Sequence, residues 1–169
     1  MGDAAGSGIG YTIREAGEED IDAIVAVVNA AYAVERFFIN TDRTYRDEIA
    51  RYRDDGTFLV AETEAGEIHG AVFLRHEGEE GYFGMLSVVP EMQGAGLGRL
   101  LVGCVEEVFG VMGCERVRIV VPNVRTELFP WYGALGYAER DTLPFPEPEK
   151  LTQPALMIEM AKDIRGSGG

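Results

Sequence analysis

The sequence has few of the residues that build metal sites or disulfide frameworks. Its 169 residues include two cysteines and two histidines. Cys104 falls on the apolar face of an expected helix, where the ordinary role is that of a small core residue. His69 and His76 lie seven positions apart on one expected strand, and this odd spacing places them on opposite faces. We therefore expect no metal site and no disulfide framework.

Long apolar runs and an excess of basic residues are also missing. No apolar stretch approaches the roughly 20 residues that a membrane span needs, and the amino-terminal sequence lacks the basic-then-apolar pattern of a secretion signal. Lysine and arginine total 15 against 29 aspartates and glutamates, which gives a formal net charge of −14. Such acidity disfavours nucleic acids and anionic membranes as partners and favours cations such as amines. The expected location is the cytoplasm.

What is present fits one globular domain. The composition is 46% hydrophobic and 26% charged, and the length suits a single core. Glycine- and serine-rich ends predict a flexible leader at 1–10 and a flexible tail at 163–169. The domain itself is expected to occupy residues 11–162.

Hydrophobic periodicity predicts a mixture of helices and strands. Apolar residues at helical spacing predict four helices, at 17–35, 44–55, 97–112 and 126–136. Alternating segments predict seven strands, at 11–16, 56–63, 68–77, 82–89, 115–121, 137–141 and 155–162. The second to fourth strands have no helix between them, so we expect an antiparallel meander. Residues 36–44 and 142–154 are expected to be loops.

The stretch QGAGLG at 93–98 places alternating glycines at the start of a helix. Gly94, Gly96 and Gly98 lack Cβ atoms, so the backbone can turn tightly and point N–H groups at an anion. The helix that begins there adds unpaired N–H groups and the positive end of its dipole. Arg99 adds a charged contact. The loop therefore predicts a phosphate or pyrophosphate site.

Two common nucleotide-binding loops do not fit this stretch. A P-loop requires a lysine after its last glycine, and none is present. A Rossmann loop requires Gly-x-Gly-x-x-Gly in a parallel unit with an acid at the end of the next strand. Here the spacing is Gly-x-Gly-x-Gly, the preceding strands form a meander, and Glu115 stands at the start of the next strand. A glycine-rich turn that binds nothing remains an alternative.

Two blocks of the sequence resemble the GNAT superfamily of N-acetyltransferases. The block LSVVPEMQGAGLGRLL is similar to the acetyl-CoA signature of that family, and the positions that match are Gln93, Gly96 and Gly98. The block VPNVRTELFPWYGALGY resembles the later motif of the family, and the positions that match are Asn123, Tyr132, Gly136 and Tyr137. The blocks occur in the family's order, and the resemblance extends from Tyr11 to Lys162.

The resemblance implies a single GNAT-like α/β (α+β) domain. Its mostly antiparallel twisted sheet would have about seven strands flanked by about four helices, splayed between the strand at 82–89 and the strand at 115–121. The implied cofactor is acetyl-CoA, with pantetheine in the splay and pyrophosphate at the glycine loop. The residues implied to bind it are Leu86, Ser87, Val88, Gln93, Gly94, Ala95, Gly96, Leu97, Gly98, Arg99 and Asn123. For Asn123, a plain turn residue is the alternative.

The resemblance also implies catalytic roles. Tyr132 resembles the general acid that protonates the leaving thiolate, although a core aromatic beside Trp131 is the alternative. The strand before the loop has no acid that could act as base. Glu35 could bind the substrate cation or act as base, or it could be a solvated residue at a helix end. The residues that would line the acceptor pocket, or simply pack, are Tyr32, Phe37 and Phe38.

The sequence thus predicts an acyltransferase. Its reaction would be direct transfer of an acetyl group from acetyl-CoA to a primary amine of a small molecule or peptide, by a monomer or a homodimer. Because no acid lies on the strand before the loop, a CoA- or acyl-CoA-binding sensor or scaffold without catalysis is an alternative. A structural domain whose loop binds nothing is another. The acceptor pocket is expected to involve the loops 36–44 and 142–154.

Overall fold

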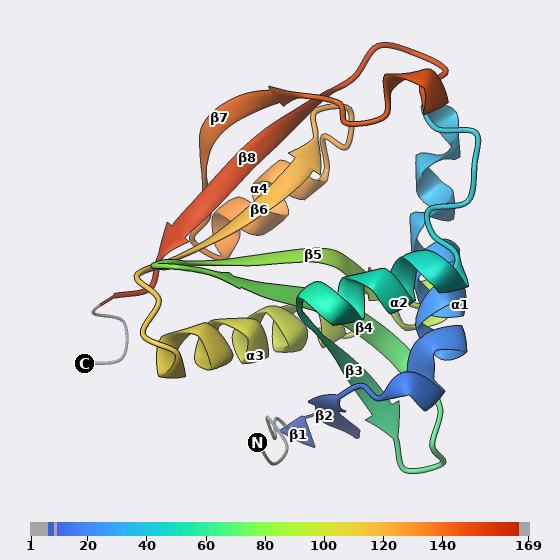
Figure 1. The fold of residues 1–169 in the computed structure, drawn as a ribbon, viewed down its shortest axis with the longest axis vertical. Helices are drawn as coiled ribbons and strands as arrows, with labels where there is room; N and C mark the ends of the chain where they lie inside the picture. The colour runs from blue at the N-terminus through green and yellow to red at the C-terminus, as the bar shows by residue number, and fades with distance from the viewer. Residues whose placement is uncertain (1–6, 9, 166–169) are drawn as a thin grey trace.

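The strands form one sheet in which neighbours in sequence are mostly neighbours in space. A computed structural model describes residues 7, 8 and 10–165 (Figure 1). Across these residues, eight strands pair in the order β1-β2-β3-β4-β5-β6-β8-β7. The bounds are β1 (Ser7–Gly8), β2 (Tyr11–Glu15), β3 (Thr57–Thr63), β4 (Ile68–Glu77), β5 (Glu80–Val88), β6 (Arg116–Pro122), β7 (Ala138–Pro144) and β8 (Leu156–Asp163). Every pair is antiparallel except β5 with β6, so the predicted sheet is confirmed.

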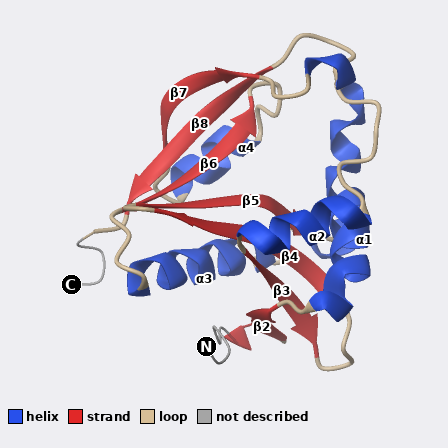
Figure 2. Ribbon diagram, viewed as in Figure 1, coloured by secondary structure: helices blue, strands red, loops and turns tan. Residues whose placement is uncertain are grey.

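Helices cover both faces of this sheet, as Figure 2 shows. The α-helices of the described chain are α1 (Ile21–Tyr32), α2 (Arg46–Asp55), α3 (Leu97–Val111) and α4 (Leu128–Ala134). Short 3-10 turns flank them, namely η1 (Glu18–Asp20), η2 (Ala33–Phe37), η3 (Pro90–Met92) and η4 (Pro148–Lys150). The helix predicted at 17–35 is therefore a regular α1 with a 3-10 turn at each end.

The predicted flexible ends lie partly outside the described residues. Residues 1–6, 9 and 166–169 are not described. Within the described part, β1 pairs with β2. At the other end β8 continues to Asp163, and Ile164 is buried and donates its N–H to the carbonyl of Glu115.

The central strands are buried on both faces because helices lie above and below them. In β3, Phe58 and Val60 pack in the cluster under α1 and α2, whereas Leu59 and Ala61 pack in the larger cluster under α3. The burial therefore runs continuously along β3 rather than alternating, as expected for a strand covered on both sides. Cys104 also lies in the larger cluster, and burial raises the pKa of its thiol.

The sheet splits in its middle. β5 and β6 pair over only three positions, Glu80↔Arg116, Gly81↔Val117 and Tyr82↔Arg118. Beyond them the strands diverge, and Figure 1 shows β5 leaving the direction of β6 and β8. The register of β4 with β5 shifts opposite Met85, whose φ of 53° is positive. Such a bulge bends a strand, so it accounts locally for the divergence, and the predicted splay is confirmed.

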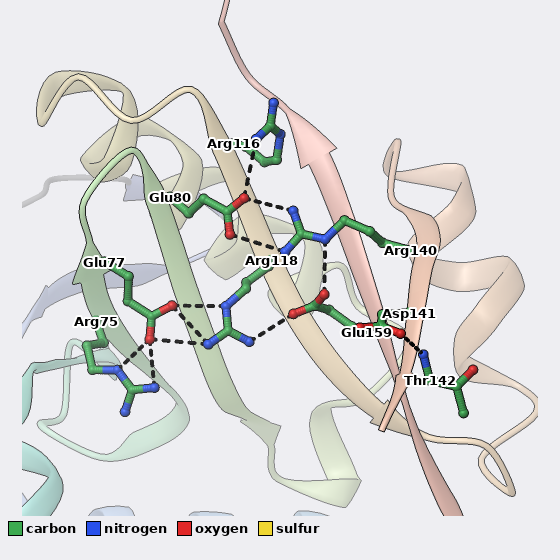
Figure 3. A network of polar contacts seen from close by, with 9 residues as sticks. All are labelled: Arg75, Glu77, Glu80, Arg116, Arg118, Arg140, Asp141, Thr142 and Glu159. Carbon is green, nitrogen blue, oxygen red and sulfur yellow. Dashed lines mark hydrogen bonds and ion pairs between the residues drawn. The ribbon is translucent and has the colours of Figure 1, made fainter. Parts of the chain in front are cut away.

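A network of charged side chains crosses the sheet where its halves join (Figure 3). Arg118 of β6 donates to Glu77 of β4 and to Glu159 of β8. Arg140 of β7 donates to Glu80 of β5 and to Glu159. The network therefore links five strands across the narrow seam between β5 and β6. Within the described residues, no helix is both long and apolar enough to cross a membrane.

Candidate active site

A groove of about 680 Å³ opens where β5 leaves β6. Its walls come from the end of β5, the loop that begins α3, the end of α1 and the face of α4. The predicted cofactor-binding residues that line it are Leu86, Val88, Gln93, Gly94, Ala95, Gly96, Leu97, Gly98 and Arg99. The structure thus brings together most of the set that the sequence implied.

The glycine loop in this groove has the backbone of an anion site. Gly94 and Gly96 have φ values of 86° and 91°, a region that residues with a Cβ rarely adopt. In the described chain, no backbone N–H of residues 94–99 donates to a protein acceptor. A Cβ on Gly98 would lie 3.3 Å from the Trp131 ring, so this glycine lets α4 approach α3. Six successive N–H groups are therefore available at the start of α3.

Three predicted cofactor contacts have other neighbours. Ser87 is buried outside the groove lining, and its hydroxyl donates to the carbonyl of Met85. Asn123 also lies outside the lining, and its side-chain oxygen accepts from the N–H of Leu156. Gln93 lines the groove, but its side chain donates to the carbonyl of Val88 at 3.0 Å. Their cofactor-binding roles stay predictions.

A second cavity, of about 460 Å³, lies next to the groove. Both predicted pocket loops, 36–44 and 142–154, contribute to its wall, together with the inner parts of β5 and β6. The loops are joined by a bridge between Ile39 and Leu151 and by the N–H of Thr152, which donates to the carbonyl of Phe38. In Figure 1 the turn η4 accordingly lies against the segment that follows α1. We call this space the acceptor cavity.

Phe37 and Phe38 do not line the acceptor cavity. Phe37 is 51% exposed, whereas Phe38 is fully buried, and their rings contact each other edge to face at 4.8 Å. The carbonyl of Phe37 accepts hydrogen bonds from Thr152 and Gln153. Both residues therefore hold the two loops together, and their role in binding substrate stays a prediction.

Tyr32 and Tyr132 line both the groove and the acceptor cavity. The Tyr132 ring is buried against Phe83, Trp131 and Tyr137. In the described chain its hydroxyl has no hydrogen-bond partner, and no fully enclosed side-chain polar atom lacks one. The hydroxyl oxygen must therefore reach open space.

Both of these tyrosines are protonated near neutral pH, and burial moves their titration still further above it. Burial raises the pKa of Tyr132 well above its ordinary value, and it raises the pKa of Tyr32 to about 12. Two neutral hydroxyl-bearing rings thus form the partition between the groove and the acceptor cavity. A neutral phenol at such a partition can donate a proton to an anion that forms there.

Glu35 lies at the same partition and carries a buried ion pair. Its side chain is buried in the wall of the acceptor cavity, and its Oε2 accepts a 2.7 Å hydrogen bond from Arg125 Nη1. Arg125 lines the groove and also donates to Glu127 at 2.6 Å. Burial raises the pKa of Glu35, although Arg125 opposes the shift. Arg125 is not among the residues that the sequence predicted, and its one sequence signal is its place between Asn123 and Tyr132.

Comparisons with known proteins agree with this geometry. The family described as the acetyltransferase (GNAT) domain matches residues 54–139, which is more than half of the chain. The ribosomal-protein-S18-alanine N-acetyltransferase of Escherichia coli is similar in structure, with a TM-score of 0.74 and 18% identity over 91% of this chain and 94% of that one. Ard1 of Thermoplasma volcanium gives a TM-score of 0.74 and 17% identity over 92% and 98%.

A further similar structure is the IAA acetyltransferase of Bacillus cereus, with a TM-score of 0.71 and 18% identity over 90% of this chain and 99% of that one. At these identities the structures support the fold, while the family match covers both the meander and the glycine loop. The chain belongs to the GNAT acetyltransferase family and is an acyltransferase.

Proposed function

We propose that the protein is an acetyl-CoA-dependent N-acetyltransferase that acts on a primary amine of a small molecule or peptide. The observation that supports this most is the shared wall, because Tyr132 borders both the groove and the acceptor cavity. Because the two cavities adjoin at Tyr132, the donor thioester in one and the acceptor amine in the other can lie next to each other, as direct transfer requires. Both cysteines of the chain are buried, so neither offers a nucleophile at the junction. The formal net charge of −14 disfavours nucleic-acid and anionic-membrane partners, and the proposed location is the cytoplasm.

The groove has features that fit the cofactor. The free N–H groups of residues 94–99 and the exposed guanidinium of Arg99 suit a pyrophosphate. Among the residues that the structure describes, the edge of β5 beyond Tyr82 has no strand partner on the β6 side, so its backbone can pair with amide groups of a pantetheine arm along Leu86, Ser87 and Val88. When bound, acetyl-CoA supplies the acetyl thioester.

The side chains at the partition have complementary roles. Glu35 accepts the proton that the substrate ammonium must lose before its nitrogen can attack, and its raised pKa makes it a better base than an ordinary carboxylate. Tyr132 holds a proton on its hydroxyl for the leaving thiolate. Tyr32 borders both the groove and the acceptor cavity, as Tyr132 does.

Thermal unfolding with CoA and thiol release with acetyl-CoA test this proposal. We expect CoA to raise the Tm, because binding adds RT ln(1 + [L]/Kd) to the free energy of unfolding, which is about 2.7 kcal/mol at a hundredfold excess over Kd. Gly96→Glu should remove the shift, because it places a charge in the groove and strains a backbone with a φ of 91°. Gly110→Glu is the matched control, since Gly110 is exposed in α3 with no atom near an added Cβ.

Thiol release across a panel of amines completes the test. An amine-dependent release of CoA thiol in the wild type is expected. A CoA-induced Tm shift without turnover on any amine would favour the sensor, and a full shift in Gly96→Glu would refute the placement of the site.

A further inference from the structure

Four basic side chains line the acceptor cavity, and they are Arg43, Arg75, Arg118 and Lys150. Three of them are held by carboxylates. Arg118 uses all three of its guanidinium nitrogens on Glu77 and Glu159 (Figure 3). Arg75 donates to Glu77 at 2.9 Å, and Lys150 has a carboxylate oxygen at 2.8 Å. Each of these three cations already has a carboxylate partner within the protein.

Arg43 differs from the other three. Within the described residues it donates no hydrogen bond, and its ion-pair partner, Glu48 Oε1, is 3.8 Å away. That distance is too long for a hydrogen bond, and the same oxygen already accepts a 2.7 Å bond from the Thr44 hydroxyl. The Arg43 side chain is 32% exposed, and no fully enclosed side-chain nitrogen in the described chain lacks a partner. Its unused donors therefore reach the open cavity.

Arg43 lies close to the partition at which the amine of the acceptor would react. Its guanidinium carbon is 5.4 Å from the centre of the Tyr32 ring, and Tyr32 belongs to the wall shared by the groove and the acceptor cavity. An anion on Arg43 would thus be close to an amine at the partition. The two groups of such an acceptor must be separated by only a few bonds.

The carboxylates of the cavity have few free oxygens with which to bind a second cationic group of a polyamine-like acceptor. Glu35 is bonded to Arg125, and Asp42 to Arg36. Glu48 is bonded to Thr44, and the fourth carboxylate, that of Glu147, pairs with a lysine. Every carboxylate in the wall therefore has a partner, even though the whole chain carries a net charge of −14.

The remaining wall is largely apolar. Val120 and Val121 of β6, Leu143 of β7 and Met157 of β8 lie there, beside Met85 of β5. Their aliphatic and thioether groups suit a hydrocarbon side chain on the acceptor. The cavity of about 460 Å³ is within the range of small-molecule sites, which is roughly 300–1,000 Å³.

We propose that the acceptor is an α-amino acid with an apolar side chain, and that Arg43 binds its carboxylate. A guanidinium offers paired donors that match a carboxylate. This inference rests on the function proposed above. In the transfer, the amine nitrogen forms a bond to the acetyl carbon and the carbon–sulfur bond breaks. Glu35 takes one proton from the ammonium before attack, the second passes from nitrogen to water after attack, and Tyr132 gives a proton to sulfur and regains one from water.

Matched acceptors test this assignment. L-leucine and L-phenylalanine would be compared with leucinamide and phenylalaninamide, which keep the amine and side chain but lose the anion, and with spermidine. We expect kcat/KM for the free acids to exceed that for the amides by about 10- to 100-fold, as for other charge-assisted hydrogen bonds. Arg43→Gln should remove this preference mainly through KM. Arg46→Gln should leave it intact, because Arg46 is exposed and neither it nor its partner Asp22 lines the cavity.

Binding without turnover keeps the two proposals distinct. Calorimetric titration of L-phenylalanine into CoA-saturated protein should give binding in the wild type and in Arg46→Gln, and at least about tenfold weaker binding in Arg43→Gln. Equal rates for acids and amides, a preference for spermidine, or an unchanged Kd in Arg43→Gln would overturn the anion site while leaving N-acetylation intact. Absence of any CoA-induced Tm shift would overturn the proposed function, and the acceptor assignment with it.

Discussion

Glu35 and Arg125 are 90 positions apart in sequence, and their side chains meet in a 2.7 Å hydrogen bond at the partition between the two cavities. Glu35 follows α1, whereas Arg125 precedes α4. The pair therefore connects the part of the acceptor-cavity wall that follows α1 to the segment that leads into α4, the helix that carries Tyr132. It also sets the charge next to the proposed reaction centre.

Replacing Glu35 should slow the chemical step. We expect Glu35→Gln to lower kcat by about 10²-fold or more, the usual contribution of a general base, and to leave the CoA-induced Tm shift unchanged. Glu127→Gln is the matched control because Glu127 is also bonded to Arg125 but is exposed. Steady-state rates of thiol release measure both. Equal losses in the two variants would mean that Glu35 only positions Arg125.

The pH profile should carry the signature of the same carboxylate. Because burial raises the pKa of Glu35, the proton acceptor is lost at a higher pH than an ordinary glutamate would allow. The rate should therefore fall on acidification, with a midpoint above 4.5. The raised pKa of Tyr132 keeps the acid protonated at alkaline pH, so no alkaline decline should appear below about pH 10. Rates from pH 4 to 10 in wild type and Glu35→Gln, with one acceptor, isolate the acidic limb. If the rate fell at the same acidic pH in the wild type and in Glu35→Gln, the fall would belong to the titration of another group.

Tyr132→Phe should separate catalysis from folding. Its hydroxyl has no hydrogen-bond partner in the described residues, so the free energy of unfolding should change by less than about 0.5 kcal/mol. The loss of the proton donor should lower kcat by about 10²-fold. Tyr137→Phe is the opposite control, because the Tyr137 hydroxyl donates to Glu106 at 2.8 Å. That variant should lose about 1 kcal/mol of stability and keep its activity.

The charged network should stabilise the seam of the sheet. Arg118→Met removes bonds to Glu77 and Glu159 and the contact of the guanidinium with Tyr82. We expect a loss of about 1–3 kcal/mol in urea unfolding, because three hydrogen bonds of a partly buried charge are lost, although Glu77 keeps Arg75 and Glu159 keeps Arg140. Arg36→Met, which removes an exposed pair with Asp42, should cost less than about 0.5 kcal/mol. A similar small effect in Arg118→Met would show that water replaces the network without cost.

Patterns with a short period were readable in the sequence, and contacts between distant segments were not. Alternation and helical spacing predicted the meander and α3 because each depends on residues a few positions apart. The glycine loop was predictable for the same reason. The bond between Glu35 and Arg125 depends on how α1 and the loop before α4 are brought together, and no local pattern records it.

The aromatic residues after α1 show the same limit at shorter range. Tyr32, Phe37 and Phe38 were all expected at the acceptor pocket, but the 3-10 turn η2 changes the direction of successive side chains. Only Tyr32 of the three reaches the cavity. The free guanidinium of Arg43 could be recognised only after the partners of the other cavity cations were known.

The three-position seam between β5 and β6 has a consequence for aggregation. Beyond Tyr82 each of these strands has an edge with unpaired backbone groups, and such edges can recruit strands of other chains. Here the two edges face each other across the space between the diverging strands, and the ring of Tyr132 and the helix α4 lie beside that space. A foreign strand would have to enter this narrow space to pair. The position of these edges thus limits strand pairing between copies of the chain, whereas the proposed function uses the β5 edge for the pantetheine arm.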